Sequence, residues 1–275
     1  LNMKKRLLYF IFISILSLQF ININAQTHTF ESVESVIKNI CYSSIDIGDF
    51  DDNGFDDILI SGAIDTDDDY NADESKIFIY KNDNGVFTEI DDPDIFGIHL
   101  GVVKFIDIDN DGDLDIIATG QNYEDITKHG LYIYENNDGK FTLKQQFQGY
   151  IYSSVDCGDF NNDGYIDFMV SGVAIVSMDS TSEEFTLYEN QKDGTFKPIE
   201  TDITPVVTGC VKFVDYNNDG MLDIVTMGYI DDFDSQSLKT YKNNNGIFEL
   251  DQELPEISLN KFSLCFLYYF PNFGR

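Results

Sequence analysis

Residues 42–54 read YSSIDIGDFDDNG, and residues 152–164 repeat them as YSSVDCGDFNNDG. The segment VKFIDIDNDG (103–112) carries the same acidic ending and recurs as VKFVDYNNDG (211–220). The four acidic runs begin at Asp49, Asp107, Asp159 and Asp215, at intervals of 58, 52 and 56 residues. A repeat of this length with only short apolar runs indicates one supersecondary unit per repeat.

Each repeat is expected to form four antiparallel strands. In the first repeat these cover residues 43–48, 57–62, 76–81 and 86–90, with the acidic run between the first two. A dipeptide typical of hairpin turns precedes the fourth strand in each repeat: Asn84-Gly85, Asp138-Gly139, Asp193-Gly194 and Asn245-Gly246. The sequence therefore predicts an all-β protein, a β-propeller with four-stranded blades at about 41–91, 98–146, 151–200 and 207–252.

The phase of the repeat bears on the number of blades. Residues 27–33 read as an orphan outer strand, because they precede the first acidic run as the fourth strand of one repeat precedes the next run. A fifth acidic run is expected near Leu267, yet the atypical tail at 253–275 does not contain one. The interpretation is a partial or truncated propeller with four visible blades, and a closed four-bladed ring is the alternative.

The N-terminus predicts export. Lys4, Lys5 and Arg6 precede an apolar run over residues 7–21, and Ala25 is a plausible cleavage point, so residues 1–25 are expected to be a signal peptide. The run is shorter than the ~20 residues of a membrane span. The protein is thus expected to be secreted or at the cell surface without a stable span, and an uncleaved anchor is the alternative.

Charge limits the classes of partner. The chain has 49 acidic and 17 basic residues, a formal net charge of −32. Such a field repels nucleic acids and anionic membranes and attracts cations. Of the four cysteines, Cys41 and Cys157 occupy places that other repeats fill with Ile, so they are predicted to be small buried apolar residues rather than disulfide partners.

The acidic runs predict calcium sites, about four ions with one per blade. Each run offers side-chain oxygens at positions 1, 3, 5 and 9, with Gly at position 6 to permit the sharp bend. The candidate side-chain ligands are Asp49, Asp51, Asn53 and Asp57; Asp107, Asp109, Asp111 and Asp115; Asp159, Asn161, Asp163 and Asp167; and Asp215, Asn217, Asp219 and Asp223. The main-chain carbonyl at position 7 is expected to add a ligand at Phe55, Asp113, Tyr165 and Met221.

Three other interpretations of the acidic runs are less favourable. An EF-hand is excluded because its final Glu would fall on apolar-strand positions: Ile60, Ala118, Val170 and Thr226. Magnesium is disfavoured because it prefers a rigid octahedron with retained waters. Turns without an ion are the alternative, but four runs in register, each with clustered carboxylates, would repel strongly without a cation.

The segment GDFDDNGFDDILISG (48–62) resembles the FG-GAP/VCBS repeats of integrin α-chain-like propellers, and the resemblance covers about residues 27–252. It implies a propeller with metal-binding loops. Such repeats occur in adhesins, receptor ectodomains and accessory regions of secreted enzymes. The broader bacterial secreted type fits better than integrin-like ligand recognition, because the Phe-Gly and Gly-Ala-Pro elements are degraded here.

Two further patterns bear on packing and recognition. The first strands carry Asp46 and Asp156 in odd repeats but Lys104 and Lys212 in even ones, which favours salt bridges between neighbouring blades over a charged ring lining a channel. The connections between the second and third strands vary most and are candidate recognition surfaces. They cover 65–75, 121–129, 174–183 and 229–237, with candidate contacts Tyr70, Tyr123, Tyr229 and Phe233.

Catalysis has little support in the sequence. His28, His99 and His129 are scattered, and no nucleophile elbow or phosphate loop occurs. The expected function is that of a non-catalytic, calcium-binding adhesion or recognition module for an extracellular protein or glycan. The alternatives are a propeller region of a polysaccharide-active enzyme, which could use two carboxylates, and a purely structural scaffold.

Overall fold

The chain divides into two compact units, residues 1–34 and 35–275. The computed structural model describes residues 37–38, 40–64, 74–92, 94–177, 180–230 and 235–254, all within the second unit. The predicted signal peptide (1–25) and orphan strand (27–33) lie outside these residues, as does the predicted tail from residue 255 onward. Glu253, which the sequence places in that tail, ends the last strand.

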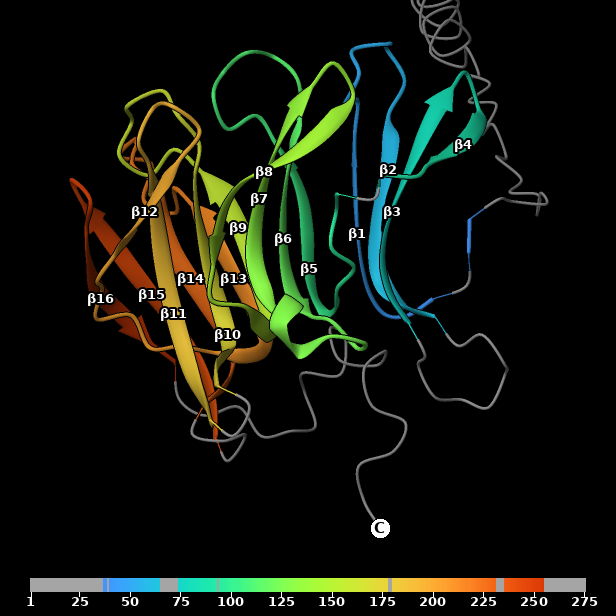
Figure 1. Cartoon of the computed structure of the whole chain (residues 1–275). Helices are drawn as coiled ribbons and strands as arrows, with labels where there is room; N and C mark the ends of the chain where they lie inside the picture. The colour runs from blue at the N-terminus through green and yellow to red at the C-terminus, as the bar shows by residue number, and fades with distance from the viewer. Residues whose placement is uncertain are drawn as a thin grey trace, which may run out of the picture. The chain divides into compact units, whose positions relative to one another are not determined.

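The described residues form four four-stranded antiparallel sheets, each from consecutive strands (Figure 1). Blade 1 comprises β1 (Cys41–Gly48), β2 (Asp57–Ile64), β3 (Glu74–Asp83) and β4 (Val86–Ile90). Blade 2 comprises β5 (His99–Ile106), β6 (Asp115–Gln121), β7 (Gly130–Asn137) and β8 (Lys140–Phe147), with a 3-10 turn, η1 (Ile126–Lys128), between β6 and β7. Blade 3 comprises β9 (Tyr150–Gly158), β10 (Asp167–Ser177), β11 (Ser180–Asn190) and β12 (Phe196–Ile199). Blade 4 comprises β13 (Val207–Val214), β14 (Asp223–Ile230), β15 (Ser235–Asn244) and β16 (Ile247–Glu253). The predicted all-β class with four-stranded blades is confirmed.

The hairpins between third and fourth strands follow the predicted turn chemistry in three blades. Asn84 and Gly85 both have positive φ, at 52° and 90°, as a two-residue type I′ turn requires. The equivalent pairs in blades 2 and 4 have the same signs of φ. In blade 3 the two-residue turn predicted at Asp193-Gly194 is wrong: β11 and β12 are joined by a five-residue loop, 191–195, closed by the Gln191 N–H donating to the Thr195 carbonyl at 2.8 Å.

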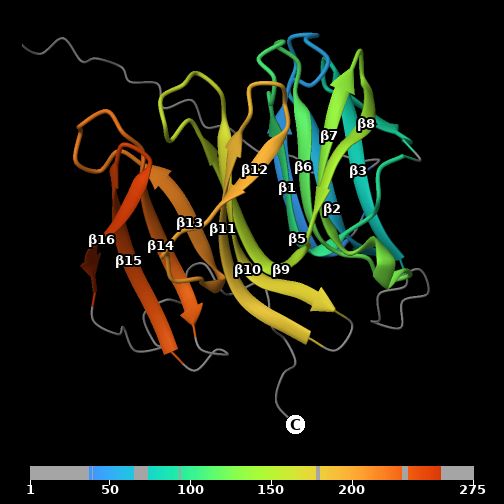
Figure 2. The same cartoon turned by 60° about the vertical axis from the view of Figure 1, so that its left-hand side comes forward.

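Apolar side chains fill the spaces between successive blades. One buried cluster joins blades 1 and 2, a second joins blades 2 and 3, and a third joins blades 3 and 4. The first strands β1, β5, β9 and β13 lie next to one another in chain order, and Figure 2 shows blades 3 and 4 side by side. The described residues show this row of blades but not the closure of a ring.

The charged residues of the first strands pair between blades. The Lys104 Nζ lies 3.3 Å from the Asp46 Oδ1, and the Lys212 Nζ lies 2.5 Å from the Asp156 Oδ1. The other oxygen of each aspartate accepts a main-chain N–H of the following blade. Asp46 accepts that of Phe105, and Asp156 accepts that of Phe213. The predicted inter-blade pairing is confirmed, and blades 1–2 and 3–4 share one contact pattern.

The prediction for the cysteines is partly wrong. Cys41 is exposed, although it pairs with buried Ala63 on the face of blade 1 that points toward blade 2. Cys157 is partly buried, and burial raises the pKa of its thiol to about 12. No disulfide forms among the three cysteines that the structure describes, which are Cys41, Cys157 and Cys210.

Candidate metal centre

The acidic loops are the residues between the first and second strands of each blade: loop 1 (49–57), loop 2 (107–115), loop 3 (159–167) and loop 4 (215–223). The last residue of each loop is a buried Asp that begins the second strand: Asp57, Asp115, Asp167 and Asp223. Its carboxylate accepts main-chain N–H groups. Asp115 accepts from Ile108 at 2.8 Å and from Asn136 at 2.7 Å, and Asp57 and Asp167 accept from equivalent residues. This carboxylate therefore ties the loop to the third strand of its own blade.

A third-strand asparagine completes this framework, and the sequence interpretation did not single it out. It follows the repeated Tyr by two residues in every blade: Asn82, Asn136, Asn190 and Asn243. The Asn136 Nδ2 donates to the Leu114 carbonyl of its own blade and to the Phe50 carbonyl of blade 1, at 3.0 and 2.8 Å. Asn190 and Asn243 make the same two contacts one blade later. The fixed Tyr–Asn spacing is the sequence signal that could have found it.

Two loop positions have left-handed backbone. Position 4 is Asp52, Asn110, Asn162 or Asn218, with φ between 52° and 62°. Position 6 is Gly in all four loops, with φ between 87° and 98°. A Cβ at these glycines would have no atom within 4 Å, so glycine is required there by backbone conformation rather than by space.

Loops 1 and 2 each gather three carboxylates around one point. Oxygens of Asp49, Asp51 and Asp57 lie within 4.8 Å of one another, and so do oxygens of Asp107, Asp109 and Asp115. Four buried carboxylate oxygens have no hydrogen-bond partner: the Oδ1 atoms of Asp51, Asp107, Asp109 and Asp113. Buried anionic oxygens that face one another without donors are costly unless a cation neutralises them. These two acidic clusters could bind a metal ion.

The raised pKa values of the loop 2 carboxyl groups agree with a cluster of negative charge that could bind a metal ion. Burial raises the pKa of Asp115 to about 7 and, together with the neighbouring Asp111, raises that of Asp113 to about 6. Burial and Asp111 also raise the pKa of Asp109. The nearest cation, the Lys144 Nζ, lies 3.8 Å from Asp109 but 2.5 Å from Glu135, so it neutralises the cluster incompletely. In loop 1 the ammonium group of Lys81 contacts Asp51 directly.

In loops 3 and 4 main-chain N–H groups satisfy the first carboxylate, as they also do for Asp49 in loop 1. Asp215 accepts the N–H groups of Asp219 and Gly220 at 3.1 and 3.0 Å, and Asp159 does the same in loop 3. Position 3 is an asparagine in both loops, and the Asn217 Nδ2 donates to Asp223 at 3.0 Å. Among the described residues, three carboxylates come together only in loops 1 and 2.

The remaining predicted ligands have local roles in the structure. In all four loops the position 5 side chain accepts the main-chain N–H of position 7; the acceptors are Asn53, Asp111, Asp163 and Asp219. At position 7 the sequence predicts a carbonyl ligand, but in loop 2 the Asp113 side chain also has a buried oxygen without a partner. Five aspartates at alternate positions of loop 2 could have indicated this side chain.

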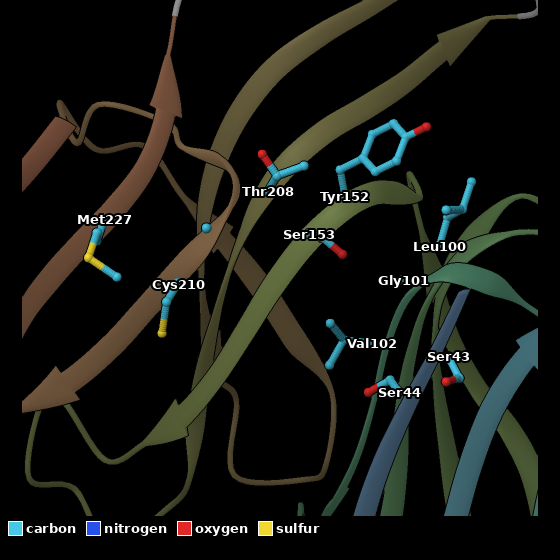
Figure 3. A pocket seen from close by; sticks show the side chains of 11 residues that line it. Ser43, Ser44, Leu100, Gly101, Val102, Tyr152, Ser153, Thr208, Cys210 and Met227 are labelled. Carbon is cyan, nitrogen blue, oxygen red and sulfur yellow. The ribbon is translucent and has the colours of Figure 1, made fainter. Parts of the chain in front are cut away.

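A pocket of about 170 Å³ lies at the opposite end of the first strands (Figure 3). Its walls come from β1, β5, β9, β13 and β14. Each first strand has a bulge here, with a non-glycine residue at positive φ: Tyr42, Leu100, Tyr152 and Thr208. The Thr208 hydroxyl is buried without a partner. Strained backbone of this kind, repeated around a pocket, is typical of ligand sites.

The variable connections lie at the same end as this pocket. Tyr123 is exposed, and its ring lies 5.8 Å from that of buried His99, which in turn lies 6.3 Å from Tyr42. Tyr229 is partly buried. Tyr70 and Phe233 lie outside the described residues. The structure therefore separates the acidic loops at one end of the blades from the pocket and variable connections at the other.

The fold and loops together define a class: an all-β, propeller-like repeat module with an aspartate-rich loop in each blade. A family model described as an FG-GAP-like repeat matches residues 107–170 and 173–226, which include loops 2, 3 and 4. The chain therefore carries FG-GAP-like repeats over these residues. Comparison with curated proteins finds no match. No helix in the described ranges is long and apolar enough to cross a membrane.

Proposed function

We propose that the chain is an extracellular, non-catalytic recognition module whose blades are stabilised by calcium in the acidic loops. The observation that carries the proposal is loop 2, where buried oxygens of Asp107, Asp109 and Asp113 have no hydrogen-bond donor. Calcium prefers six to eight hard oxygen ligands in flexible geometry, and carboxylates clustered in a short loop provide them. The apolar signal-like run at residues 7–21 supports export.

Asp107, Asp109 and Asp115 would hold the ion in loop 2, and Asp49, Asp51 and Asp57 would hold it in loop 1. A bound divalent cation supplies the positive charge that cancels repulsion among these carboxylates. The role is structural, because Asp115 and Asn136 already join the loop to its own blade and to blade 1. Loops 3 and 4 complete the expected set of about four ions with weaker sites, since asparagine replaces the position 3 carboxylate in each.

The recognition surface is assigned to the opposite end of the blades. The pocket there has hydroxyl groups from Ser43, Ser153 and Thr208 beside apolar side chains, and exposed Tyr123 stands on the adjacent variable connection. Aromatic rings and hydroxyls suit an extracellular protein or glycan. The separation of this end from the acidic loops lets calcium stabilise the scaffold without occupying the recognition surface.

Thermal unfolding in EDTA and in rising calcium, with bound ions counted, tests the calcium proposal. An ion at about a hundred times its dissociation constant adds about 2.7 kcal/mol to stability. The expected result is a large rise in melting temperature with at least two ions bound. An unchanged melting temperature, with no ion bound, would contradict it.

Recognition is tested with a glycan array and a panel of extracellular proteins, comparing the unmodified chain with Tyr123→Ala. The expected result is binding that the substitution weakens by at least about tenfold, or 1.4 kcal/mol. Incubation with polysaccharides and analysis of the products provides the second readout. Product formation would identify an enzyme and overturn the non-catalytic assignment, and absence of any ligand would favour a scaffold.

A further inference from the structure

The interface between two successive blades occurs three times in the described residues and provides a template. We define the exit face of a blade as the face toward the next blade in the chain, and the entry face as the face toward the preceding one. From blade 2 to blade 3, the Gln145 side-chain amide bonds both main-chain groups of Phe196: its Nε2 donates to the carbonyl at 2.9 Å, and its Oε1 accepts the N–H at 2.8 Å. The even blade thereby binds the fourth strand of the odd blade that follows through two hydrogen bonds.

No blade among the described residues lies against the entry face of blade 1. Ile45 occupies the place of Val103 and Val211, which are fully buried against a preceding blade, yet it is 59% exposed. The neighbouring Ile47, on the same side of β1, is also exposed. On the same face, Ile60, Phe78 and Tyr80 form a buried cluster against which Ile37 and Ile40 pack. The face has the composition of a blade interface without a blade against it.

The exit face of blade 4 carries the matching half. Val214 is 37% exposed, whereas its equivalent Ile106 in blade 2 is 5% exposed against blade 3. Gln252 is the equivalent of Gln145: the two face Thr240 and Ile133 at the same place in the third strand, directly before the same bulge. Odd blades have no such bulge between their third and fourth strands. The exit face of blade 4 is therefore that of an even blade.

Polar side chains that bond between successive blades also lack this partner at the two ends of the row. The Asn110 Nδ2 donates to the Gly164 carbonyl of the next blade at 2.8 Å, and the Asn162 Nδ2 donates to the Gly220 carbonyl at 2.9 Å. Asn218 is the equivalent in blade 4, and its side chain bonds to no group within the described part of the chain. On the entry side, Asn82 bonds the Asp56 carbonyl of its own blade but has no carbonyl of a preceding blade to contact there.

We propose that the exit face of blade 4 binds the entry face of blade 1 of a second copy of this chain, head to tail. The contact would follow the interface of blades 2 and 3, with Gln252 on the main chain of Phe87, Asn218 on the Gly54 carbonyl, and Asn82 on the Tyr216 carbonyl. A second copy is the occupant because each chain carries both halves of an interface that its own blades already form. Figures 1 and 2 both show blades 1 and 4 at opposite ends of the row. A contact of this heterologous kind closes into a ring or extends into a chain.

The net charge of −32 opposes association of two copies. At about 0.15 M salt the Debye length is about 8 Å, so long-range repulsion is screened while the short-range contact remains. Association is therefore expected to strengthen with salt, as the apolar composition of both faces requires.

Sedimentation velocity on the full chain, over about a hundredfold range of concentration at about 0.15 M salt with calcium present, tests the proposal. The expected result is a concentration-dependent species of two or more copies. Ile45→Asp, Val214→Asp and Gln252→Ala should each weaken association by at least tenfold. A sample that remains monomeric throughout would overturn the proposal.

Matched controls separate the interface from general effects. Leu143→Asp adds the same charge at an exposed leucine of blade 2, and Gln146→Ala removes an exposed amide next to Gln145. Neither should change association, and melting temperatures identify any variant that misfolds. A mixture of Ile45→Asp and Val214→Asp chains retains one intact exit face and one intact entry face, so association should return on mixing. Equal loss in the control variants, or no recovery in the mixture of folded variants, would overturn the head-to-tail assignment.

Discussion

Loops 2 and 4 occupy the same place in two even-numbered blades, yet their carboxylates differ in whether they have hydrogen-bond partners. Loop 2 has aspartate at positions 1, 3, 5, 7 and 9, and three of these side chains have buried oxygens without partners. Loop 4 replaces positions 3 and 7 with Asn217 and Met221, and Asn217 donates to the buried Asp223. Both loops keep the same glycine conformation and the same third-strand asparagine. The scaffold of the loop and its demand for a cation are thus separate properties, set by different residues.

The largest expected effect comes from removing the position 9 carboxylate of each loop. Asp115 accepts two main-chain N–H groups, while Asp223 accepts one from Asn243. Each unpaired buried donor costs about 1–3 kcal/mol. In EDTA, Asp115→Ala should therefore lower the free energy of unfolding by about 2–6 kcal/mol. Asp223→Ala should cost less, as measured by urea denaturation, because one of its two donors is the partly buried Asn217 side chain rather than a buried main-chain N–H. Equal losses would show that the two loops are anchored alike.

Blades 2 and 4 also differ at the start of their first strands, where His99 stands in the place of Val207. His99 is buried between Ser75 and Gln121, and burial lowers its pKa to about 4. The unfolded chain, with a histidine pKa of 6.5, binds the proton first as the pH falls. His99 therefore contributes stability that is present above pH 6.5 and is lost down to about pH 4, by up to about 3 kcal/mol.

Replacing His99 with the valine of blade 4 tests this difference. His99→Val should lose less stability than the unmodified chain when unfolding is measured at pH 6.5 and again at pH 4. The loss is calculated for each protein relative to its own stability at neutral pH, because the substitution also removes two hydrogen bonds. Identical losses over this range would show that His99 does not cause the acid sensitivity.

Reciprocal substitutions at position 3 sharpen the cation comparison. Asp109→Asn gives loop 2 the residue of loop 4 and should weaken calcium binding there by about tenfold, or 1.4 kcal/mol. In EDTA the same substitution should stabilise the protein, because it removes a buried charge. Asn217→Asp should strengthen calcium binding in loop 4 and destabilise the ion-free protein. Calorimetric titration measures both changes, and changes of the same sign in both variants would break the comparison.

The smallest difference is expected at the position 6 glycines. Gly112 and Gly220 have φ of 98° and 87°, and neither has an atom near the place of a Cβ. Alanine at either position should cost about 1–2 kcal/mol from left-handed backbone alone, equally in the two loops. Melting temperatures in EDTA provide the measurement. A much larger cost in loop 2 would mean that its backbone is strained beyond the shared scaffold.

The fold could be predicted from the sequence because its repeats keep the same landmark residues at similar spacing. The acidic run, the Tyr and the Asn-Gly or Asp-Gly turn recur in register, so the strand order of every blade follows from spacing. The two-residue turn predicted at Asp193-Gly194 is wrong because Lys192 and Gly194 have the positive φ values, within a longer loop. The burial predicted for Cys41 is wrong because Cys41 is the first residue of β1, and a bulge separates it from the regular part of the strand.

The candidate site was predicted less completely than the fold. Alternating oxygens in the acidic runs predict a cation site, but they do not distinguish loop 2 from loop 4. That distinction depends on whether main-chain N–H groups, as at Asp215, already satisfy the carboxylates. The bridging role of Asn136 was missed because its partner, Phe50, lies 86 residues away in the chain.

The most direct test of the account is a calcium-loaded crystal structure with anomalous scattering data to locate the ions. The account predicts the strongest calcium peak among Asp107, Asp109 and Asp115, the next among Asp49, Asp51 and Asp57, and weaker peaks in loops 3 and 4. Peaks confined to loops 3 and 4, or no calcium in any acidic loop, would contradict it.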